Sequence, residues 1–454
     1  MTHENFEPTL DPGLVARHAR ALPRYTSYPT ANHFHAGVDQ TVFRGWLASL
    51  RRDAPVSAYV HVPFCQELCW YCGCSTKATR RYAPVSAYVE ALEAELAALA
   101  GALGFSPKLK NLHFGGGSPD ILTPQDVARL VQALAGTFAF EPGLEFAVEI
   151  DPRLMNEQKA DAFARAGVTR VSFGVQDFDE RVQKAIGRMQ SFAATRAAVE
   201  AFRARGVGSV NLDLVYGLPR QTLASLEATL QAALSLSPDR LALFGYAHLP
   251  QRIANQRLID EATLPGAQER FEQARLAERV LRRAGYVQLG IDHFAKPDDK
   301  IAQNQISRNF QGYTDDACGA LIGIGASAIS RLPQGYAQNA VPVGVHAELV
   351  KAGGLATRRG FALAPEDEMR GFVIERLMCD FSFPGRALAE RYGGLAEPLA
   401  REAREALAAD ADGFLEPTLD GFRLREWARP FARQVAARFD AYLGAGGARH
   451  SLAV

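Results

Sequence analysis

The sequence has no excess charge of either sign and no long apolar segment. Its 454 residues include 50 lysines and arginines against 50 aspartates and glutamates. Because nucleic acids and anionic membranes attract clustered basic residues, this balance predicts neither a nucleic-acid partner nor binding to a membrane surface. No uninterrupted apolar run reaches the roughly 18 residues that a membrane-spanning helix needs, so we expect no membrane span.

The sequence also lacks the marks of secreted proteins and of coiled coils. Its first residues, MTHENFEPTLDPG, are polar and acidic, without the apolar region of a secretory signal. We therefore expect a cytoplasmic protein, in which thiols stay reduced. Apolar heptads are missing, so a monomer is the default expectation. Cysteine is scarce, with six in the chain, which makes any clustering of cysteines informative.

From residue 58 to about residue 330, short apolar runs alternate with amphipathic stretches. Runs of this kind, followed by glycine, proline or polar turns, are typical of strands buried on both faces. Their alternation with helices predicts an α/β fold with a parallel sheet: a barrel, a partial barrel or an open doubly wound sheet. The predicted strands are 58–62, 111–114, 145–150, 170–175, 210–215, 241–246 and 287–291.

Helix start and stop signals lie between these runs. Thr123 is predicted to cap a helix that begins with Pro124, and Asn156 a helix that ends before Gly167. The stretches 86–103 and 268–285 have the apolar spacing of one-sided helices.

The pattern changes after about residue 355. Helices are predicted over 365–378, 386–394 and 397–413, followed by two short strands around Asp420 and Gly421 and a final helix. We predict four parts: an N-terminal arm packed on the barrel (1–50), a catalytic barrel (51–335), a connecting segment (336–360) and a small, mainly helical C-terminal domain (361–454).

Polar residues directly follow five of the predicted strands. In parallel sheets, functional side chains gather at the carboxyl ends of the strands. Any one such segment is as easily a tight turn, but five at one rim favour a functional site. The segments are HFGGGSPD, EIDPR, GVQDFD, DLVYGLP and YAHLP.

Four of the six cysteines lie within residues 65–74, CQELCWYCGC, in the spacing C-x3-C-x2-C-x-C. A structural zinc site usually has a second, separate pair of ligands, which is missing here. Disulfides are disfavoured by the expected compartment, and a redox C-x2-C pair leaves Cys65 and Cys74 unexplained. Three thiolates on one loop instead suit a [4Fe–4S] cluster, whose fourth iron stays open to a small chelating molecule.

This spacing resembles the signature of radical S-adenosylmethionine (SAM) enzymes. Tyr71, before the third cysteine, and the GGGSP loop at 115–119 also fit that superfamily. The resemblance implies a cluster that binds SAM through its open iron and cleaves it to a 5′-deoxyadenosyl radical. It also implies a fold: a partial (β/α)6-type TIM-like barrel.

A longer series of motifs resembles one family, the oxygen-independent coproporphyrinogen III oxidases. The similarity extends over roughly residues 20–450. The motifs, in order, are RYTSYPT (24–30), HVPFCQELCWYCGC (61–74), HFGGGSP, EIDPR, SFGVQDF, NLDLVYGLP, GYAHLP, DHFA and RNFQGYT.

The family's reaction is implied by that resemblance. It is the oxidative decarboxylation of two propionate groups of coproporphyrinogen III to vinyl groups, which gives protoporphyrinogen IX for haem biosynthesis. The radical would remove a hydrogen from the propionate β-carbon, and two turnovers would consume two SAM molecules. An electron donor such as flavodoxin or ferredoxin is implied as a partner.

Site residues follow from the same resemblance. Cys65, Cys69 and Cys72 are implied as cluster ligands, and Cys74 as a characteristic cysteine that is not a ligand. Arg24 and Arg308 are predicted to bind the substrate's propionates, because both are embedded in aromatic, turn-rich segments. For the SAM bound to the cluster the implied residues are Tyr59, Gly116, Glu149 and Ile329. For a second SAM they are Tyr71, Gly117, Ser118, Gln176, Arg188, Asp213 and Ala247.

The resemblance weakens between residues 296 and 319. The segment 296–314 is shorter than is usual in the family, Ser307 replaces a common histidine, and Cys318 is unexpected there. The alternatives are a haem chaperone of the same superfamily, a paralogue with an altered tetrapyrrole substrate, a haem-opening methyltransferase relative or a non-catalytic iron–sulfur scaffold. Cys74 and the RYTSYPT arm favour the oxidase over the chaperone.

Overall fold

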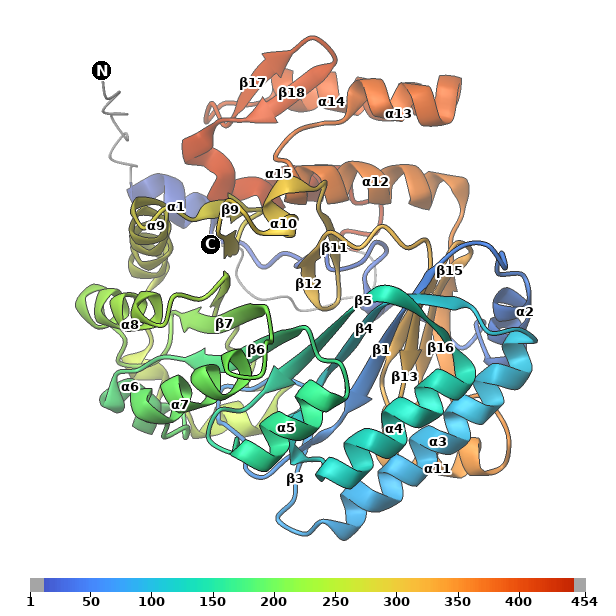
Figure 1. The fold of residues 1–454 in the computed structure, drawn as a ribbon. Coiled ribbons are helices and arrows are strands. Elements are labelled where there is room, and N and C mark those ends of the chain that lie inside the picture. Colours follow the sequence, from blue (N-terminus) through green and yellow to red (C-terminus); the bar gives the residue numbers. More distant parts are fainter. Residues whose placement is uncertain (1–11, 445–454) are drawn as a thin grey trace.

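The computed structural model describes residues 12–444, and its centre is one twelve-stranded sheet (Figure 1). The strand order is β16-β15-β14-β13-β1-β4-β5-β6-β7-β8-β10-β9, and the strands from β13 to β8 are parallel. The predicted parallel α/β sheet is therefore confirmed. Six of the predicted strands form its middle: β1 (Val56–Val62), β4 (Lys108–Gly116), β5 (Ala139–Ile150), β6 (Arg170–Gln176), β7 (Ser209–Tyr216) and β8 (Arg240–Gly245).

The seventh predicted strand, 287–291, does not continue the parallel series. It gives β9 (Val287–Leu289), and the chain then turns at Gly290, where φ is 54°. It returns at once as β10 (His293–Ala295), which pairs antiparallel with β8 and separates β9 from it. An apolar run predicts a strand but not its neighbour, and this tight turn gives the edge of β8 to β10.

A meander that the sequence did not predict extends the other end of the sheet. It consists of β13 (Leu321–Ile324), β14 (Ile329–Leu332), β15 (Gly335–Asn339) and β16 (Thr357–Ala362), with α11 (Val343–Lys351) before β16. The segment 336–360 thus lies mostly in sheet strands and a helix. The division of the chain at residues 50, 335 and 360 stays a prediction.

Helices cover the outer face of the parallel strands (Figure 1). Their predicted caps are confirmed: the Thr123 side chain accepts a hydrogen bond from the Asp126 amide, and Asn156 from that of Lys159. The helices are α3 (Ala83–Leu103), α4 (Pro124–Thr137), α5 (Glu157–Arg165), α6 (Glu180–Ala185), α7 (Phe192–Arg203), α8 (Leu223–Ser235) and α9 (Ala267–Arg283). Short 3-10 turns lie at η2 (Pro119–Ile121), η3 (Ala254–Leu258) and η4 (Glu261–Thr263).

The C-terminal region lies above the sheet in Figure 1. Between this region and the sheet lie α10 (Lys300–Gln303) and a hairpin formed by β11 (Ser307–Asn309) and β12 (Gly312–Thr314). The predicted helices and strand pair are present, and residues 445–454 lie outside the described residues. The elements are α12 (Pro365–Cys379), α13 (Gly385–Tyr392), η5 (Gly393–Ala396), α14 (Glu397–Ala408), β17 (Leu415–Thr418), β18 (Gly421–Leu424), η6 (Glu426–Phe431), α15 (Ala432–Ala436) and η7 (Ala437–Phe439).

The N-terminal arm connects the two hydrophobic cores of the molecule. Its elements are α1 (Pro12–His18), η1 (Ala31–His33) and α2 (Gln40–Ala48). Leu14 and Tyr25 are buried in the core of the C-terminal region, whereas Phe43 and Leu47 are buried in the core of the barrel. The part of the arm in residues 1–11 lies outside the described residues.

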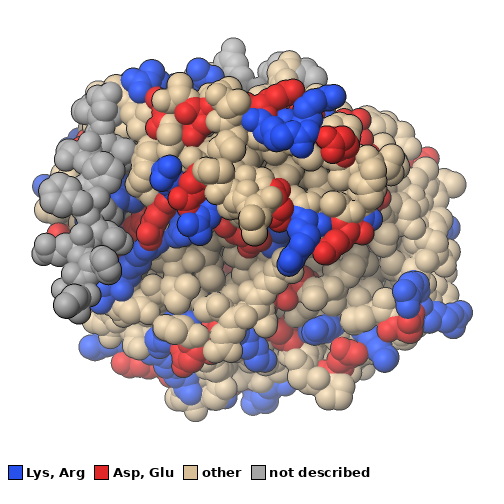
Figure 2. Space-filling model, turned by 90° about the horizontal axis from the view of Figure 1, so that it is seen from above, with Lys and Arg blue, Asp and Glu red and all other residues tan. Residues whose placement is uncertain are grey.

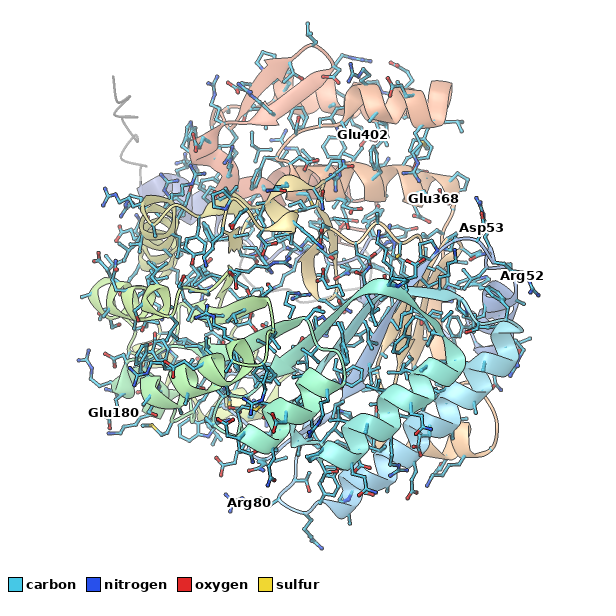
Figure 3. The ribbon with its side chains drawn as sticks, in the orientation of Figure 1. Arg52, Asp53, Arg80, Glu180, Glu368 and Glu402 are labelled. Carbon is cyan, nitrogen blue, oxygen red and sulfur yellow. The ribbon has the colours of Figure 1, made fainter. Side chains whose placement is uncertain are left out.

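Charged side chains are distributed as the balanced composition suggests. Both signs are interspersed over the face in Figure 2, and Arg80, Glu180 and Glu368 project outward in Figure 3. Within residues 12–444, no helix combines the length and the apolar character that a membrane crossing requires.

Candidate active site

The cysteine loop, residues 65–74, leaves the sheet at the carboxyl end of β1. Two short strands, β2 (Phe64–Cys65) and β3 (Lys77–Ala78), pair in parallel and close the loop at its base. Within the loop, the Cys72 amide donates to the Cys69 carbonyl at 3.2 Å. All four cysteines are free thiols. The loop therefore presents reduced sulfur ligands at the rim where parallel sheets place functional groups.

Asn255 of η3 fixes the shape of this loop. Its side-chain amide nitrogen lies within hydrogen-bond distance of three carbonyl oxygens, those of Cys69, Trp70 and Cys72, at 3.0, 3.1 and 2.9 Å. Three carbonyls turned toward one donor define a tight coil of backbone. Sequence reasoning missed Asn255, because one asparagine far along the chain gives no local signal.

A large cavity inside the barrel, here called the cysteine cavity, borders the loop. It spans about 1450 Å³, part of which is open to solvent, and reaches from the cysteine loop to the β11–β12 hairpin. Cys65, Cys69, Cys72 and Cys74 line it together. Eight of the residues implied for SAM binding also line it: Tyr71, Gly116, Gly117, Ser118, Glu149, Gln176, Arg188 and Asp213.

Tyr59, Ala247 and Ile329 do not line the cysteine cavity. The Tyr59 hydroxyl contacts His61 Nδ1 at 3.0 Å, and Ile329 is the first residue of β14. The Ala247 carbonyl accepts a hydrogen bond of 3.0 Å from Gln256, whose amide also donates to the Tyr71 carbonyl. The structure thus connects Ala247 to the cysteine loop through its backbone.

The glycine loop after β4 fits tightly beside the cysteine loop. Gly116 has a φ of 113°, and a Cβ atom on it would lie 2.5 Å from the His61 ring. On Gly117 a Cβ atom would lie 2.5 Å from the Phe64 carbonyl oxygen. Both positions therefore require glycine, and the bare backbone between them is accessible from the cysteine cavity.

Glu149 lies at the end of β5 and faces the glycine loop. Its carboxylate accepts hydrogen bonds from the Gly116 amide at 3.1 Å and from His113 Nε2 at 3.2 Å. Burial opposes its ionisation, but these hydrogen bonds, first the one from His113, outweigh burial and lower the pKa of Glu149. The side chain is therefore an ionised acceptor inside the cysteine cavity.

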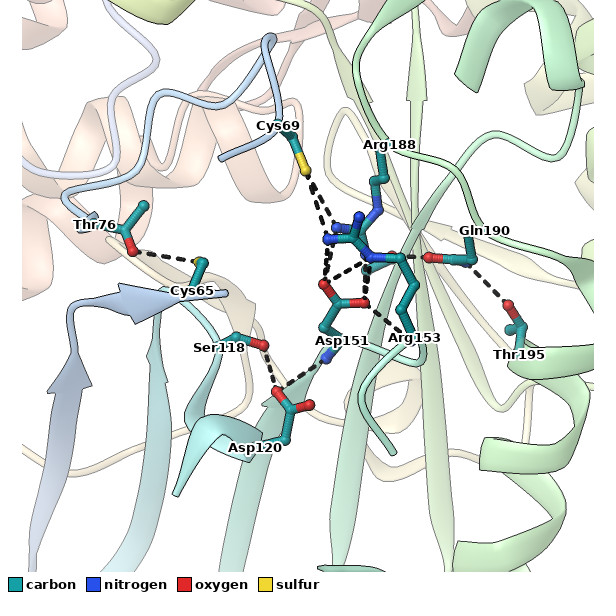
Figure 4. A network of polar contacts seen from close by, with 11 residues as sticks. Cys65, Cys69, Thr76, Ser118, Asp120, Asp151, Arg153, Arg188, Gln190 and Thr195 are labelled. Atoms are coloured by element: carbon teal, nitrogen blue, oxygen red, sulfur yellow. Dashed lines mark hydrogen bonds and ion pairs between the residues drawn. The ribbon is translucent and has the colours of Figure 1, made fainter. Parts of the chain in front are cut away.

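Arg188, Asp151 and Arg153 form an ionic network against Cys69 (Figure 4). Arg188 Nη1 lies 3.4 Å from the Cys69 sulfur and 3.2 Å from Asp151 Oδ2, and Arg153 Nη2 lies 3.9 Å from the same sulfur. Burial alone would raise the pKa of Asp151. The hydrogen bond from Arg153 and the charge of Arg188 outweigh burial, so the pKa of Asp151 lies below its ordinary value. The terminal nitrogens of Arg188 thus already have protein partners, while its buried Nε has none in the described residues.

Cys74 contacts the neighbouring sulfur ligand. Its amide nitrogen lies 3.4 Å from the Cys72 sulfur. Hydrogen bonding from Cys74 lowers the pKa of the Cys72 thiol to about 7 despite its burial, whereas burial raises the pKa of Cys65 to about 12. Cys74 therefore acts as a donor to Cys72, which agrees with a cysteine that supports a ligand.

Arg24 and Arg308 lie together, but outside the cysteine cavity. Arg308 Nε donates to the Arg24 carbonyl at 3.3 Å, and Arg24 Nη2 to the Gly245 carbonyl at 2.9 Å. Both line a separate cavity of about 940 Å³ that is partly open to solvent, here called the arginine chamber. Its arginines are Arg24, Arg270, Arg275, Arg308, Arg429 and Arg433.

The side chains of the cysteine cavity fit a [4Fe–4S] cluster with one open iron. Three free thiols on one loop can each hold a different iron, and glycine backbone approaches the space beside them. Such ligands need not meet at one point. In residues 12–444, no three His, Cys, Asp or Glu side chains are arranged around a single metal ion.

Comparisons with known proteins agree with this geometry. Residues 59–233 match the radical SAM superfamily, which implies a [4Fe–4S] cluster and SAM as cofactors. An oxygen-independent coproporphyrinogen III oxidase from Bradyrhizobium diazoefficiens is 45% identical, over 95% of this chain and 97% of that protein. One from Salmonella typhimurium is 37% identical, over 95% of both chains.

A solved structure extends the similarity to three dimensions. The coproporphyrinogen III oxidase HemN from Escherichia coli, described as a radical SAM enzyme, superposes with a TM-score of 0.88 at 35% identity. The superposition covers 95% of this chain and 99% of that one. The similarity therefore includes the arm and the C-terminal region as well as the barrel.

Proposed function

We propose that this chain, which belongs to the oxygen-independent coproporphyrinogen III oxidase family, decarboxylates coproporphyrinogen III. Two propionate side chains would become vinyl groups, which gives protoporphyrinogen IX without oxygen. The observation that carries the proposal is three reduced cysteines on one loop beside a glycine loop, in a chain similar to these oxidases over its whole length.

The residues of the cysteine cavity have distinct tasks. Cys65, Cys69 and Cys72 would hold three irons of the cluster, and Cys74 would donate to the sulfur of Cys72. When bound, the cluster and SAM supply one-electron cleavage of a sulfonium C–S bond and the removal of a hydrogen from the propionate β-carbon. The barrel holds this chemistry in an interior cavity, which limits the access of water.

Two residues would orient the SAM at the cluster. The backbone at Gly116 can approach the methionine part because no side chain intervenes. Glu149 stays ionised and already accepts two hydrogen bonds, which leaves lone pairs for the ribose hydroxyls. Tyr59 and Ile329 complete this group by the family resemblance.

A second SAM molecule in the same cavity is part of the proposal. Gln176, Arg188 and Asp213 line the cavity on β6, the loop after α6 and β7, away from the glycine loop. Asp213 is held by Ser172 and Asn211 at 2.9 and 2.7 Å, which fixes its carboxylate toward the cavity. Tyr71, Gly117, Ser118 and Ala247 belong to the same proposed group.

The substrate contacts are proposed because Arg24 and Arg308 both lie in aromatic, turn-rich segments, and the electron donor is proposed on the family resemblance. Arg24 and Arg308 would bind substrate propionates, and a flavodoxin or ferredoxin would supply the electron. A cytoplasmic monomer is the proposed form, in agreement with the balanced charge.

The test is anaerobic turnover by the full chain after cluster reconstitution. The protein is incubated with reductant, SAM and coproporphyrinogen III, and the porphyrin products and 5′-deoxyadenosine are quantified by mass. Loss of two CO2 per macrocycle, with about two 5′-deoxyadenosines, supports the proposal. SAM cleavage without decarboxylation retains the radical enzyme and rejects this substrate. Haem binding without decarboxylation points to the chaperone.

A further inference from the structure

The arginine chamber lies on the opposite face of β8 from the cysteine cavity. Leu243 lines the chamber, and the next residue, Phe244, lines the cysteine cavity. Because consecutive strand residues point to opposite faces, β8 separates the two spaces. The other walls come from α9, the residues around Asp292, the β11 strand and η6 with α15. The N-terminal arm contributes Arg24.

The lining of the chamber has far more positive than negative charge. Its described lining residues include six arginines but two carboxylates, Asp292 and Glu278. Glu278 is already 3.2 Å from Arg275 and 3.1 Å from Arg282. By contrast, the Arg240 guanidinium in the cysteine cavity donates to both oxygens of the Asp299 carboxylate. The chamber is therefore short of anions.

Three guanidinium nitrogens in the chamber are buried without a hydrogen-bond partner among residues 12–444. They are Arg270 Nε, Arg308 Nη1 and Arg429 Nε. Arg308 is 8% exposed, and its Nη1 lies 3.8 Å from Asp292 Oδ1, which is too far for a hydrogen bond. A buried charged donor without an acceptor is costly, so these nitrogens indicate a missing anionic ligand.

Arg270 is the clearest case. It lies on the first turn of α9, over the Tyr216 ring at 6.0 Å, and its buried Nε has no hydrogen-bond partner among residues 12–444. Burial, and after it the repulsion from Arg24, lower the pKa of Arg433, another arginine of the chamber, to about 10. An anion placed between them would relieve that repulsion.

The chamber adjoins the cysteine cavity at the β10 edge and at the β11–β12 hairpin. Phe294 lines both spaces, and the hairpin places Arg308 in the chamber while Gln311 and Tyr313 line the cysteine cavity. The Arg308 guanidinium lies over the Tyr313 ring at 4.4 Å. The two spaces therefore share a wall at Phe294 and at the hairpin, so a group bound in the chamber lies next to the cysteine cavity.

We propose that the arginine chamber binds carboxylates of the tetrapyrrole that are not reacting, with Arg270 and Arg308 as their main partners. This rests on the proposed function and names the part of the site that recognises the substrate class. Arg24 and Arg429 complete the chamber. Planar guanidiniums suit carboxylates, because two parallel hydrogen bonds can form to each.

The experiment compares Arg270→Gln and Arg308→Gln with wild type, using full-length reconstituted protein. Arg283→Gln is the matched control, because Arg283 lies on the same helix but is exposed to solvent. Coproporphyrin III binding is measured by fluorescence quenching without SAM or reductant, and KM for coproporphyrinogen III is measured separately. The tetramethyl ester and citrate serve as second and third probes. Thermal melts identify any variant that fails to fold.

We expect Kd and KM to rise about tenfold or more in Arg270→Gln, while Arg283→Gln matches wild type. Arg270→Lys should recover part of the affinity, and the ester should not distinguish wild type from Arg270→Gln. Because Arg308 also donates to the Arg24 carbonyl, Arg270→Gln keeps the test valid if Arg308→Gln unfolds.

The failures of the two proposals can be told apart. Wild-type turnover with unchanged Kd and KM in both variants overturns the chamber proposal and leaves the oxidase intact. Arginine-dependent binding of coproporphyrin III without any turnover retains the chamber and rejects the oxidase. Stabilisation by citrate that requires Arg270, without binding of coproporphyrin III, overturns the chamber proposal in favour of a small anion.

Discussion

The cysteine loop follows β1 in the middle of the sheet, the arginine chamber lies beside β8, and the two are built in different ways. The four cysteines occupy ten consecutive residues, 65–74. The six arginines come from four separate segments: the arm, α9, β11 and the C-terminal region. The loop is a local structure whose chemistry is visible in its spacing. The chamber exists because the fold brings distant segments together.

The two regions also differ in how their charges are satisfied. In the network beside Cys69, Arg188 and Arg153 both contact the Asp151 carboxylate. Among the buried nitrogens of these two arginines, Arg188 Nε has no hydrogen-bond partner in the described residues. In the arginine chamber, Arg270 and Arg308 retain buried donors with no acceptor in the described chain. The chamber therefore leaves three buried guanidinium nitrogens open to a ligand in the described residues, whereas the network at Cys69 leaves one, Arg188 Nε.

Loss of a single cluster thiol is the largest expected effect. Cys72→Ala removes one of the three proposed ligands, so we expect less iron and SAM-cleavage activity reduced at least about a thousandfold. Cys318→Ser is the control, because Cys318 lies outside the loop. Iron content and electron paramagnetic resonance of the reduced protein report the cluster. A Cys72→Ala protein with wild-type iron and activity would remove Cys72 from the ligand set.

Neutralising Glu149 should weaken SAM binding. Glu149→Gln keeps the shape but removes an ionised acceptor, so the Kd for SAM is expected to rise about ten- to a hundredfold. Equilibrium binding of SAM to the reconstituted protein measures this, and the iron content should not change. Exposed Glu157 provides a control as Glu157→Gln. Equal affinities in Glu149→Gln and wild type would contradict the role given to Glu149.

A buried carboxyl under the glycine loop should make stability depend on pH. Asp120 is fully buried, its Oδ2 has no partner in the described residues, and burial raises its pKa to about 6. The folded chain thus binds this proton more tightly than the unfolded chain. Its contribution to stability falls as pH rises from about 4 to about 6, and the loss persists above that range.

At pH 7.5 the free energy of unfolding of Asp120→Asn should therefore exceed that of wild type by about 1–3 kcal/mol, since one pKa unit corresponds to about 1.4 kcal/mol. The difference should shrink toward pH 4. Denaturant titrations at several pH values measure it, with exposed Asp298→Asn as the control. A difference that grows as the pH falls would contradict the assignment.

The smallest expected effect is a change in the reduction potential of the cluster. Arg153 Nη2 lies 3.9 Å from the Cys69 sulfur and stabilises negative charge there. Arg153→Gln should lower the reduction potential of the cluster by an amount on the order of tens of millivolts, with iron content unchanged. Arg165→Gln is the control, because Arg165 lies on the outer helix α5. Identical reduction potentials for Arg153→Gln and wild type in a redox titration would contradict an effect of this network on the cluster.

Local signals predicted much of the fold and of the cysteine cavity. The caps at Thr123 and Asn156 and the six central strands were found because capping and apolar runs act within a few residues. The β13–β16 meander was missed, since its short strands pair antiparallel and have no crossover helices to mark them. Asn255 was missed because its three bonds depend on tertiary placement.

The arginine chamber was predicted in part. Arg24 and Arg308 were chosen for their aromatic, turn-rich segments, and the fold brings them into contact. Arg270 and Arg429 resemble ordinary solvent-facing charges of amphipathic stretches, so periodicity alone assigns them to the surface. Their burial depends on packing between α9, the arm and the C-terminal region, which a sequence pattern does not encode.

The most direct measurement of the central claim is deuterium transfer from coproporphyrinogen III labelled at the propionate β-carbons. The reconstituted wild-type protein is incubated anaerobically with labelled substrate, SAM and reductant, and the isotope content of 5′-deoxyadenosine is read by mass spectrometry. If the radical forms in the cysteine cavity and the substrate is held by the arginine chamber, each decarboxylation should transfer one deuterium to one molecule of 5′-deoxyadenosine. SAM cleavage that leaves 5′-deoxyadenosine free of deuterium would contradict it.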